Sequence, residues 1–210
     1  MKVRGSRLIQ GFGINDANYN VTLQENINGR WVQTWRCPYY GVWRGVIARC
    51  RSSKALAVAP TYSGCTIYEP WSSFMTFRDW MMTQDWQGKQ LDKDILFEGN
   101  KHYSPETCCF VDARVNTFII ERGVDRGEYP LGVHLYKRTG KFQAICSNPF
   151  TNTKEHLGYF ITPEDAHLAW LERKYTHACS LAMTQDSLKV AEALVMRYAK
   201  RLSTLSKSHF

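Results

Sequence analysis

The residues best suited to carry out chemistry lie between Gly88 and Asn116. In this stretch an apolar run is interrupted by Asp92, Lys93 and Asp94 and then reaches a turn. A carboxylate, with an Asn or His, can hold a divalent cation on a scissile phosphate, while a His beside the carboxylate activates water. A strand that begins with polar groups, followed by a turn and a short helix, suits such metal-assisted hydrolysis.

The candidate ligands for a Mg²⁺ ion here are Asp92 and Asp94, and the candidate catalytic residues are Asp92, Lys93 and His102. We expect the turn at Gly99-Asn100, with the short helix beginning near residues 103–106. Lysine with its ordinary pKa of about 10.4 is a poor base at neutral pH. The alternative interpretation is that residues 92–94 form only an ion-pair cluster at a strand edge.

Several short motifs in the first two thirds of the chain have the same order and spacing as those of a known family. They include Cys37-Pro38-Tyr39-Tyr40, Trp80-Met81, residues 91–96, Gly99-Asn100-Lys101 and residues 103–108. Residues 88–116 resemble a degenerate HNH nuclease motif, and the whole chain resembles phage-encoded proteins similar to HNH homing endonucleases.

In that resemblance Asp92 takes the place of the acidic metal ligand. Lys93 stands where the general-base His is expected, and Cys108 lies near the place of the metal-binding Asn. Magnesium prefers oxygen ligands to thiolate. Two of the three catalytic residues of the motif are therefore replaced. This favours a protein that binds DNA and cleaves it weakly or not at all.

Residues 132–182 have the pattern of three short strands followed by a helix. Apolar residues alternate around a Thr139-Gly140 turn, and residues 157–161 supply the third strand. Thr162 is a suitable N-cap with Pro163 at the first helical position, and apolar residues then follow at helical spacing.

The second face of this sheet is the candidate nucleic-acid contact. A two- or three-stranded ribbon fits the major groove, where Arg and Lys reach phosphates or guanine and Gln can contact adenine. The alternative is a solvated hairpin with ordinary surface lysines. The candidate contacts are His134, Tyr136, Arg138, Lys141, Gln143 and Lys154.

Motifs in this region also resemble a known domain. They are Gly132-Val133, residues 140–144, residues 157–160, residues 162–166 and Ala169-Trp170. This stretch resembles the AP2 DNA-binding domain, which implies contact with double-stranded DNA through the sheet. Plant members have an aromatic residue, usually Trp, at Phe142, so sequence preference does not carry over.

The N-terminal segment is basic, with nine Lys or Arg against two acidic residues in positions 1–54. Asn28-Gly29 predicts a tight turn or hairpin leading into residues 30–32. Pro38 opens an expected helix whose apolar stripe includes Trp43, Val46 and Ile47. Three arginines lie largely off that stripe: Arg44, Arg49 and Arg51. They form either a solvated basic face or contacts with phosphates.

The composition is consistent with a protein that binds nucleic acid. The 210 residues contain 27 basic and 19 acidic side chains, a formal charge of +8, which attracts polyanions but also simply favours solubility. No run approaches the roughly 20 apolar residues of a membrane span, so we expect no membrane partner. The seven cysteines are an odd number, without the paired spacing of a zinc site, and we expect them to be reduced.

These patterns predict an α+β fold. It comprises a degenerate HNH-like (ββα) region, then an AP2-like three-stranded antiparallel sheet packed on one helix, and a C-terminal helix. The expected segments are 1–54, basic with a helix near 38–52; 55–122, HNH-like; 123–130, a linker; 131–182, AP2-like; and 183–210, an amphipathic helix. The stripe of that last helix packs on the AP2-like unit or pairs with another subunit in a homodimer.

The resemblances imply a phage DNA-binding protein in the bacterial host cytoplasm that cleaves weakly or not at all. One alternative is an active Mg²⁺-dependent endonuclease that uses Asp92 with Lys93 or His102. Another is a non-catalytic phage protein that binds and inhibits a host protein.

Overall fold

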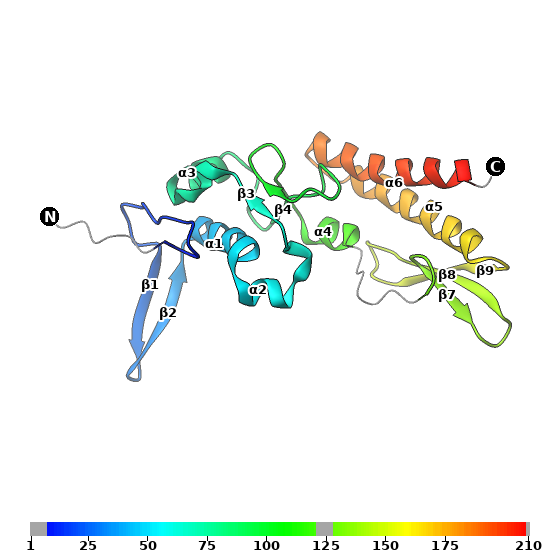
Figure 1. Ribbon diagram of the computed structural model, residues 1–210, viewed down its shortest axis with the longest axis horizontal. Coiled ribbons are helices and arrows are strands. Elements are labelled where there is room, and N and C mark those ends of the chain that lie inside the picture. The colour runs from blue at the N-terminus through cyan, green and yellow to red at the C-terminus, as the bar shows by residue number, and fades with distance from the viewer. Residues whose placement is uncertain (1–7, 121–127, 209–210) are drawn as a thin grey trace. The chain divides into compact units, whose positions relative to one another are not determined.

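Figure 1 shows a computed structural model that describes residues 8–120 and 128–208. The chain divides into two compact units, Met1–Val111 and Asp112–Phe210, and each is described separately. Helices and small sheets both contribute, so the fold class is α+β, as predicted. Most of the predicted linker, residues 123–127, lies outside the described residues, as do residues 1–7 of the basic segment. The five-segment division stays a prediction.

The first unit combines short helices with three two-stranded sheets. Strands β1 and β2 pair antiparallel, β3 and β5 pair parallel, and β4 and β6 pair antiparallel. The elements are β1 (Thr22–Ile27), β2 (Arg30–Arg36), α1 (Pro38–Arg51), α2 (Ser53–Val58), η1 (Pro60–Tyr62), β3 (Thr66–Ile67), η2 (Glu69–Ser72), α3 (Phe74–Met82), β4 (Gln90–Asp92), β5 (His102–Tyr103) and β6 (Cys109–Val111).

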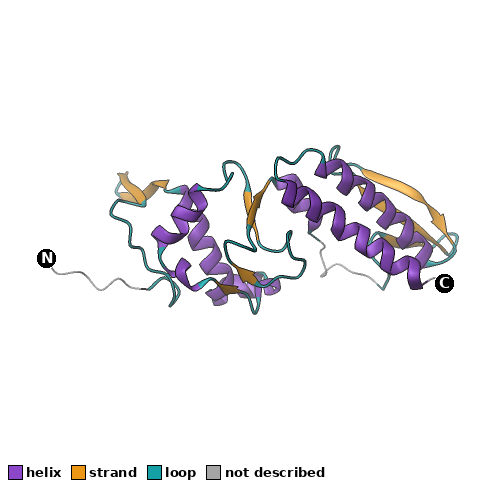
Figure 2. Cartoon of the chain, turned by 90° about the horizontal axis from the view of Figure 1, so that it is seen from above, coloured by secondary structure: helices purple, strands orange, loops and turns teal. Residues whose placement is uncertain are grey.

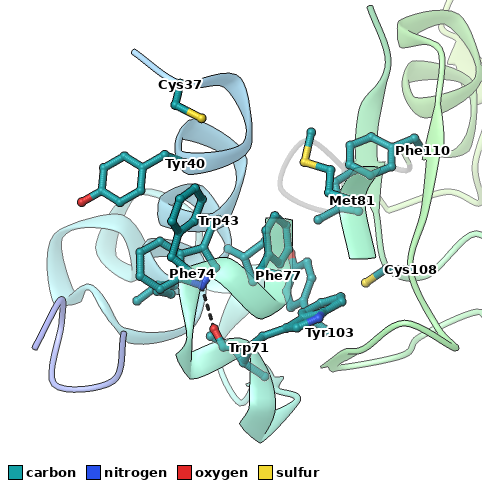
Figure 3. Close-up of a cluster of buried hydrophobic side chains, with 14 of the residues drawn as sticks. Cys37, Tyr40, Trp43, Trp71, Phe74, Phe77, Met81, Tyr103, Cys108 and Phe110 are labelled. Atoms are coloured by element: carbon teal, nitrogen blue, oxygen red, sulfur yellow. Dashed lines mark hydrogen bonds between the residues drawn. The ribbon is translucent and has the colours of Figure 1, made fainter. Parts of the chain in front are cut away.

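An aromatic core holds this unit together (Figure 3). Helix α1 begins at Pro38, as predicted, and buries Trp43 and Ile47 against α3. The Trp43 indole donates a hydrogen bond of 2.7 Å to the carbonyl of Trp71. Gly13 fits closely here, because a Cβ at this position would lie 2.5 Å from the Ile47 side chain.

The β1–β2 hairpin extends away from the helices of its own unit (Figure 1). Its turn is Asn28-Gly29, both with positive φ (52° and 80°), which confirms the predicted tight turn. At the base, the backbone N–H of Cys37 donates to the carbonyl of Val21, and both residues are buried. The hairpin is therefore anchored at its base.

The second unit has a three-stranded sheet and three helices. They are α4 (Ala113–Ile119), β7 (Val133–Tyr136), β8 (Lys141–Ser147), β9 (Lys154–Phe160), α5 (Pro163–Ala182) and α6 (Leu188–Ser208). The sheet is antiparallel in the order β7-β8-β9, and α5 packs on it, as predicted. Helix α6 runs beside α5 (Figure 2). Lys174 of α5 donates a 2.8 Å hydrogen bond to the carbonyl of Phe118 in α4.

The contact between sheet and α5 rests on small residues. Ala144 of β8 and Ala166 of α5 are fully buried with Val133 of β7. Gly132 precedes this strand at φ 76°, and a Cβ there would lie 1.9 Å from the Trp170 ring. Only glycine fits, because both the backbone conformation and the indole exclude a side chain.

Three local predictions need correction. The third strand of the sheet begins at Lys154 and ends at Phe160, earlier than the predicted span of 157–161. No helix begins at residues 103–106, because Tyr103 pairs with Ile67 in a parallel bridge and residues 104–107 form a turn. The last helix begins at Leu188 rather than at residue 183, with the Ser187 hydroxyl accepting from Val190.

Candidate functional site

The sheet of the second unit presents one face to α5 and the opposite face outward. Val133, Ala144 and Gly158 form a cross-strand row, and the buried Ala144 shows that this row faces α5. Because successive side chains of a strand alternate between faces, the neighbouring rows point the other way. The outward residues are His134, Gln143 and Tyr159 in one row, Tyr136 and Lys141 in the next, and Ile145, His156, Ser147 and Lys154 beyond the bulge in β8.

Five of the six residues of the sheet region that were predicted to contact DNA lie together on this outward face. They are His134, Tyr136, Lys141, Gln143 and Lys154. Arg138 lies in the exposed turn between β7 and β8, with its guanidinium 5.4 Å from the centroid of the Tyr136 ring. The contact orients Arg138 beside the sheet face, where it adds positive charge.

Two aromatic residues on this face were missed from the sequence. Tyr159 lies 5.1 Å from the Tyr136 ring centroid and 4.7 Å from that of His156, so three rings form a strip across the sheet. Alternation along β9 from Lys154 would have identified His156 but not Tyr159, because the bulge between these two residues shifts the alternation by one position. The outward face thus combines basic, amide and aromatic groups.

Polar contacts fix β9 against α5 behind this face. Glu155 of β9 accepts hydrogen bonds from Asn148 at 2.8 Å and from the buried His177 of α5 at 2.9 Å. Its carboxylate also lies 3.6 Å from the Arg173 guanidinium. The hydrogen bond from Asn148, followed by that from His177, lowers the pKa of Glu155 below its ordinary value. These contacts stabilise the sheet in one orientation on the helix.

The three predicted arginines of α1 have different surroundings. Arg44 is exposed on the helix surface. Arg49 is half-buried, with its guanidinium 5.7 Å from the Tyr62 ring centroid. Arg51 lies 5.1 Å from the centroid of Phe12. Arg44 and Arg51 present charge to solvent, whereas Arg49 contributes to packing within the unit.

Asp92 lies at the end of β4, opposite Cys109 of β6. Its Oδ1 atom accepts backbone hydrogen bonds from Asp94 at 2.8 Å and Ile95 at 2.6 Å. Burial, together with the nearby charge of Asp94, raises the pKa of Asp92. In this arrangement the carboxylate closes the turn after β4.

Lys93 is buried, 7% exposed, and its amine holds the following loop. Nζ donates to the Asp94 carboxylate at 2.8 Å and to the carbonyl of Asn100 at 2.7 Å. Asn100 donates in return to the carbonyls of Lys93 and His102, at 2.6 and 2.7 Å. Lys93 therefore acts as a structural cation that holds this loop.

His102, the third candidate catalytic residue, and the two cysteines before β6 and within it also have defined surroundings. His102 lies on β5, where its Nδ1 atom is 2.8 Å from the Thr66 hydroxyl. Burial raises the pKa of Cys108 and of Cys109 to about 12 each, so both are neutral thiols at physiological pH. A neutral thiol is a poor metal ligand.

The magnesium site expected at Asp92 and Asp94 stays a prediction. One Asp92 oxygen is occupied by two backbone N–H groups, and an Asp94 oxygen by the Lys93 ammonium. Within residues 8–120 and 128–208, no group of three or more His, Cys, Asp or Glu side chains could hold a metal ion. Strands β4 and β6 belong to the first unit and α4 to the second, so the predicted ββα arrangement stays a prediction.

Comparison with known proteins gives one informative similarity. Over 47 residues the chain is 45% identical to ethylene-responsive transcription factor ERF116 of Arabidopsis thaliana. This supports an AP2-like region. The similarity spans 22% of this chain and only 16% of the plant protein, so it does not extend beyond that region. No family model and no solved structure matches the chain.

The AP2-like region is the part of the sequence resemblance that the comparison supports. The HNH likeness and the phage origin rest on the sequence motifs alone. None of the helices described is long and apolar enough to cross a membrane.

Proposed function

We propose that this chain binds duplex DNA through the outward face of the β7-β8-β9 sheet. The observation that supports this most strongly is the gathering of His134, Lys141, Gln143 and Lys154 on one exposed face, beside Arg138. Basic side chains at such a face contact phosphates, and amide or imidazole groups can contact base edges in the major groove. The similarity to a plant transcription factor supports the same activity.

We further propose that the Asp92 region binds or cleaves DNA weakly or not at all. Lys93 is engaged with Asp94 and Asn100, and a paired ammonium does not accept a proton from water. The Cys108 thiol is a poor substitute for an oxygen ligand of Mg²⁺. The nuclease-like motif then acts as a scaffold in a phage-encoded protein of the host cytoplasm.

The sheet proposal is tested by replacing Arg138 and Lys141 together with alanine. Each lost phosphate contact reduces the slope of log affinity against log salt by about 0.9 for duplex DNA. We expect weaker duplex binding at low salt and a shallower slope, measured by fluorescence anisotropy across a salt series.

A matched control is Lys189→Ala with Lys200→Ala, which removes two exposed charges from α6. This control lowers the net charge by the same two units as the sheet variant and leaves the sheet unchanged. If both double variants weaken binding equally, charge alone explains the effect and the sheet has no special role.

Cleavage is tested with supercoiled plasmid in Mg²⁺, in Mn²⁺ and in chelator. We expect binding without nicking under all three conditions. Metal-dependent nicking that disappears in Asp92→Asn would instead establish the endonuclease alternative; asparagine keeps the oxygen that accepts from Asp94 and Ile95. The absence of both nicking and duplex binding would favour the host-protein alternative.

A further inference from the structure

The β1–β2 hairpin has two chemically different faces. Cross-strand partners lie on the same face of a hairpin, and successive pairs alternate between the faces. A bulge between Leu23 and Gln24 shifts this alternation once, because Thr34 is the extra residue in β2. One face therefore carries three pairs, which define what we call the Leu23 face: Leu23 with Trp35, Glu25 with Val32, and Ile27 with Arg30.

Two side-chain hydrogen bonds agree with this assignment. At the bulge, the Thr34 hydroxyl donates to the Glu25 carboxylate at 3.4 Å, on the Leu23 face. On the opposite face, the Arg36 guanidinium donates to the Gln33 amide oxygen at 3.1 Å. The opposite face is polar apart from Trp31.

Four large apolar side chains of the Leu23 face are exposed to solvent. Leu23, Ile27, Val32 and Trp35 are 48%, 47%, 43% and 42% exposed. A two-stranded hairpin is marginally stable by itself, and a contiguous exposed apolar patch usually marks an interaction site. The Leu23 face is therefore a candidate interaction surface.

The charges on the Leu23 face narrow the choice of partner. This face holds one acidic residue, Glu25, and one basic residue, Arg30. A carboxylate within the patch disfavours the phosphate groups of nucleic acid or of anionic lipid, because like charges repel. One charge of each sign on an apolar patch suits a self-complementary surface, which a two-fold symmetric dimer requires.

The positions of the two charges also select an orientation. A two-fold axis that runs along the strands, between two stacked hairpins, places β1 of one copy over β2 of the other. Leu23 of one copy then faces Trp35 of the other, and Glu25 lies one cross-strand pair, about 7 Å along the strand, from Arg30 of the other. An axis across the strands would instead bring the two Glu25 carboxylates together, which is unfavourable.

We propose that this chain forms a homodimer in which the Leu23 faces of two hairpins pack against each other. The apolar side chains form the centre of the interface, and Glu25 of each copy pairs with Arg30 of the other. Two such small faces bury less than the roughly 1,200 Å² of a standard interface, so the dimer is weak and depends on protein concentration. It does not depend on DNA binding by the β7-β8-β9 sheet.

Sedimentation equilibrium of the full chain over a concentration series tests the apolar contact. We expect Ile27→Thr with Val32→Thr to raise the dissociation constant of the dimer at least tenfold, because threonine keeps the β-branched shape but buries less apolar surface. Both positions are exposed, so folding should be unaffected.

The matched control for this variant is Trp31→Thr, which removes an apolar side chain from the opposite face. We expect this control to dimerise like wild type. Equal weakening by the control and the Leu23-face variant would overturn the proposal. So would a wild-type chain that stays monomeric throughout the concentration series.

Charge reversal tests whether the partner is a second copy. Glu25→Arg alone places like charges at both ion pairs of the dimer, as does Arg30→Glu alone, so each should raise the dissociation constant about tenfold at low salt. Mixed in equal amounts, the two variants form a heterodimer in which both pairs again join opposite charges. The mixture should therefore dimerise like wild type.

Two outcomes of this experiment would overturn the proposal. One is a mixture that associates no better than either variant alone, because the two charges would then not meet across the interface. The other is a dimer that persists unchanged in every hairpin variant, because its interface would then lie elsewhere, as on the stripe of α6. Neither outcome bears on duplex binding by the sheet.

Discussion

At the scale of single residues, Lys93 connects the end of β4 with the loop that follows. Its ammonium contacts the Asp94 carboxylate and the Asn100 carbonyl, at 2.8 and 2.7 Å. Removing a buried donor leaves a partly buried acceptor, here the Asn100 carbonyl, without this hydrogen bond, and this cost exceeds the net gain from forming the bond.

We expect Lys93→Met to lower the free energy of unfolding by about 2 kcal/mol, because methionine preserves much of the side-chain volume but cannot donate to Asn100. Urea denaturation measures the change. Lys189→Met, at an exposed site on α6, should change stability by less than about 0.5 kcal/mol. Equal stability of Lys93→Met and wild type would show that the loop does not depend on this amine.

The lysine at position 93 was visible in the sequence, but its structural role was not. The hydrogen bond to Asn100 joins residues seven positions apart and depends on how the intervening loop closes. The ion pair with Asp94 is the interpretation that the sequence had offered as the alternative to a catalytic cluster. Local spacing could suggest the pair but not the burial that makes it structural.

At the scale of elements, the contact between β9 and α5 depends on the ionised form of Glu155. Its pKa is lowered, so its contribution to stability is present above the ordinary value of 4.5 and disappears as pH falls through the lower folded value. Protonation removes a charged acceptor from His177 and Asn148.

Glu155→Gln should therefore be less stable than wild type at pH 6, and the difference should shrink as the pH falls from about 5 to about 3. Thermal unfolding across this pH series measures the effect. Glu172→Gln, at an exposed position on α5, serves as the control. A difference that stays constant with pH would contradict the role of the ionised carboxylate.

Elements with strong local signals were predicted correctly. Pro38 opens α1, Asn28-Gly29 forms the hairpin turn, and the Thr162 hydroxyl accepts from Asp165 at the start of α5. Residues 103–106 had a local helix signal as well, yet Tyr103 pairs with β3 instead. That pairing joins segments about 36 residues apart, and local patterns do not contain it.

At the scale of the whole molecule, the α+β class and the sheet packed on one helix followed from periodicity and turn residues. The outward position of Lys141 and Gln143 also followed, because alternation fixes the face of each residue once the strand is known. The exposure of Trp31 and Trp35 did not follow, because tryptophan is more often buried and only the structure shows how far these two side chains lie from the core among the described residues.

Each of the two units contains at least one buried cysteine. Cys37, Cys65 and Cys108 are buried in the first unit, and Cys146 is buried in the second. Burial raises the pKa of Cys146 to about 11, so it reacts slowly with alkylating reagents until its surroundings open. The rate at which each buried cysteine is alkylated therefore measures how often its own unit unfolds. Peptide mass spectrometry distinguishes the cysteines, so the opening of the two units can be followed separately.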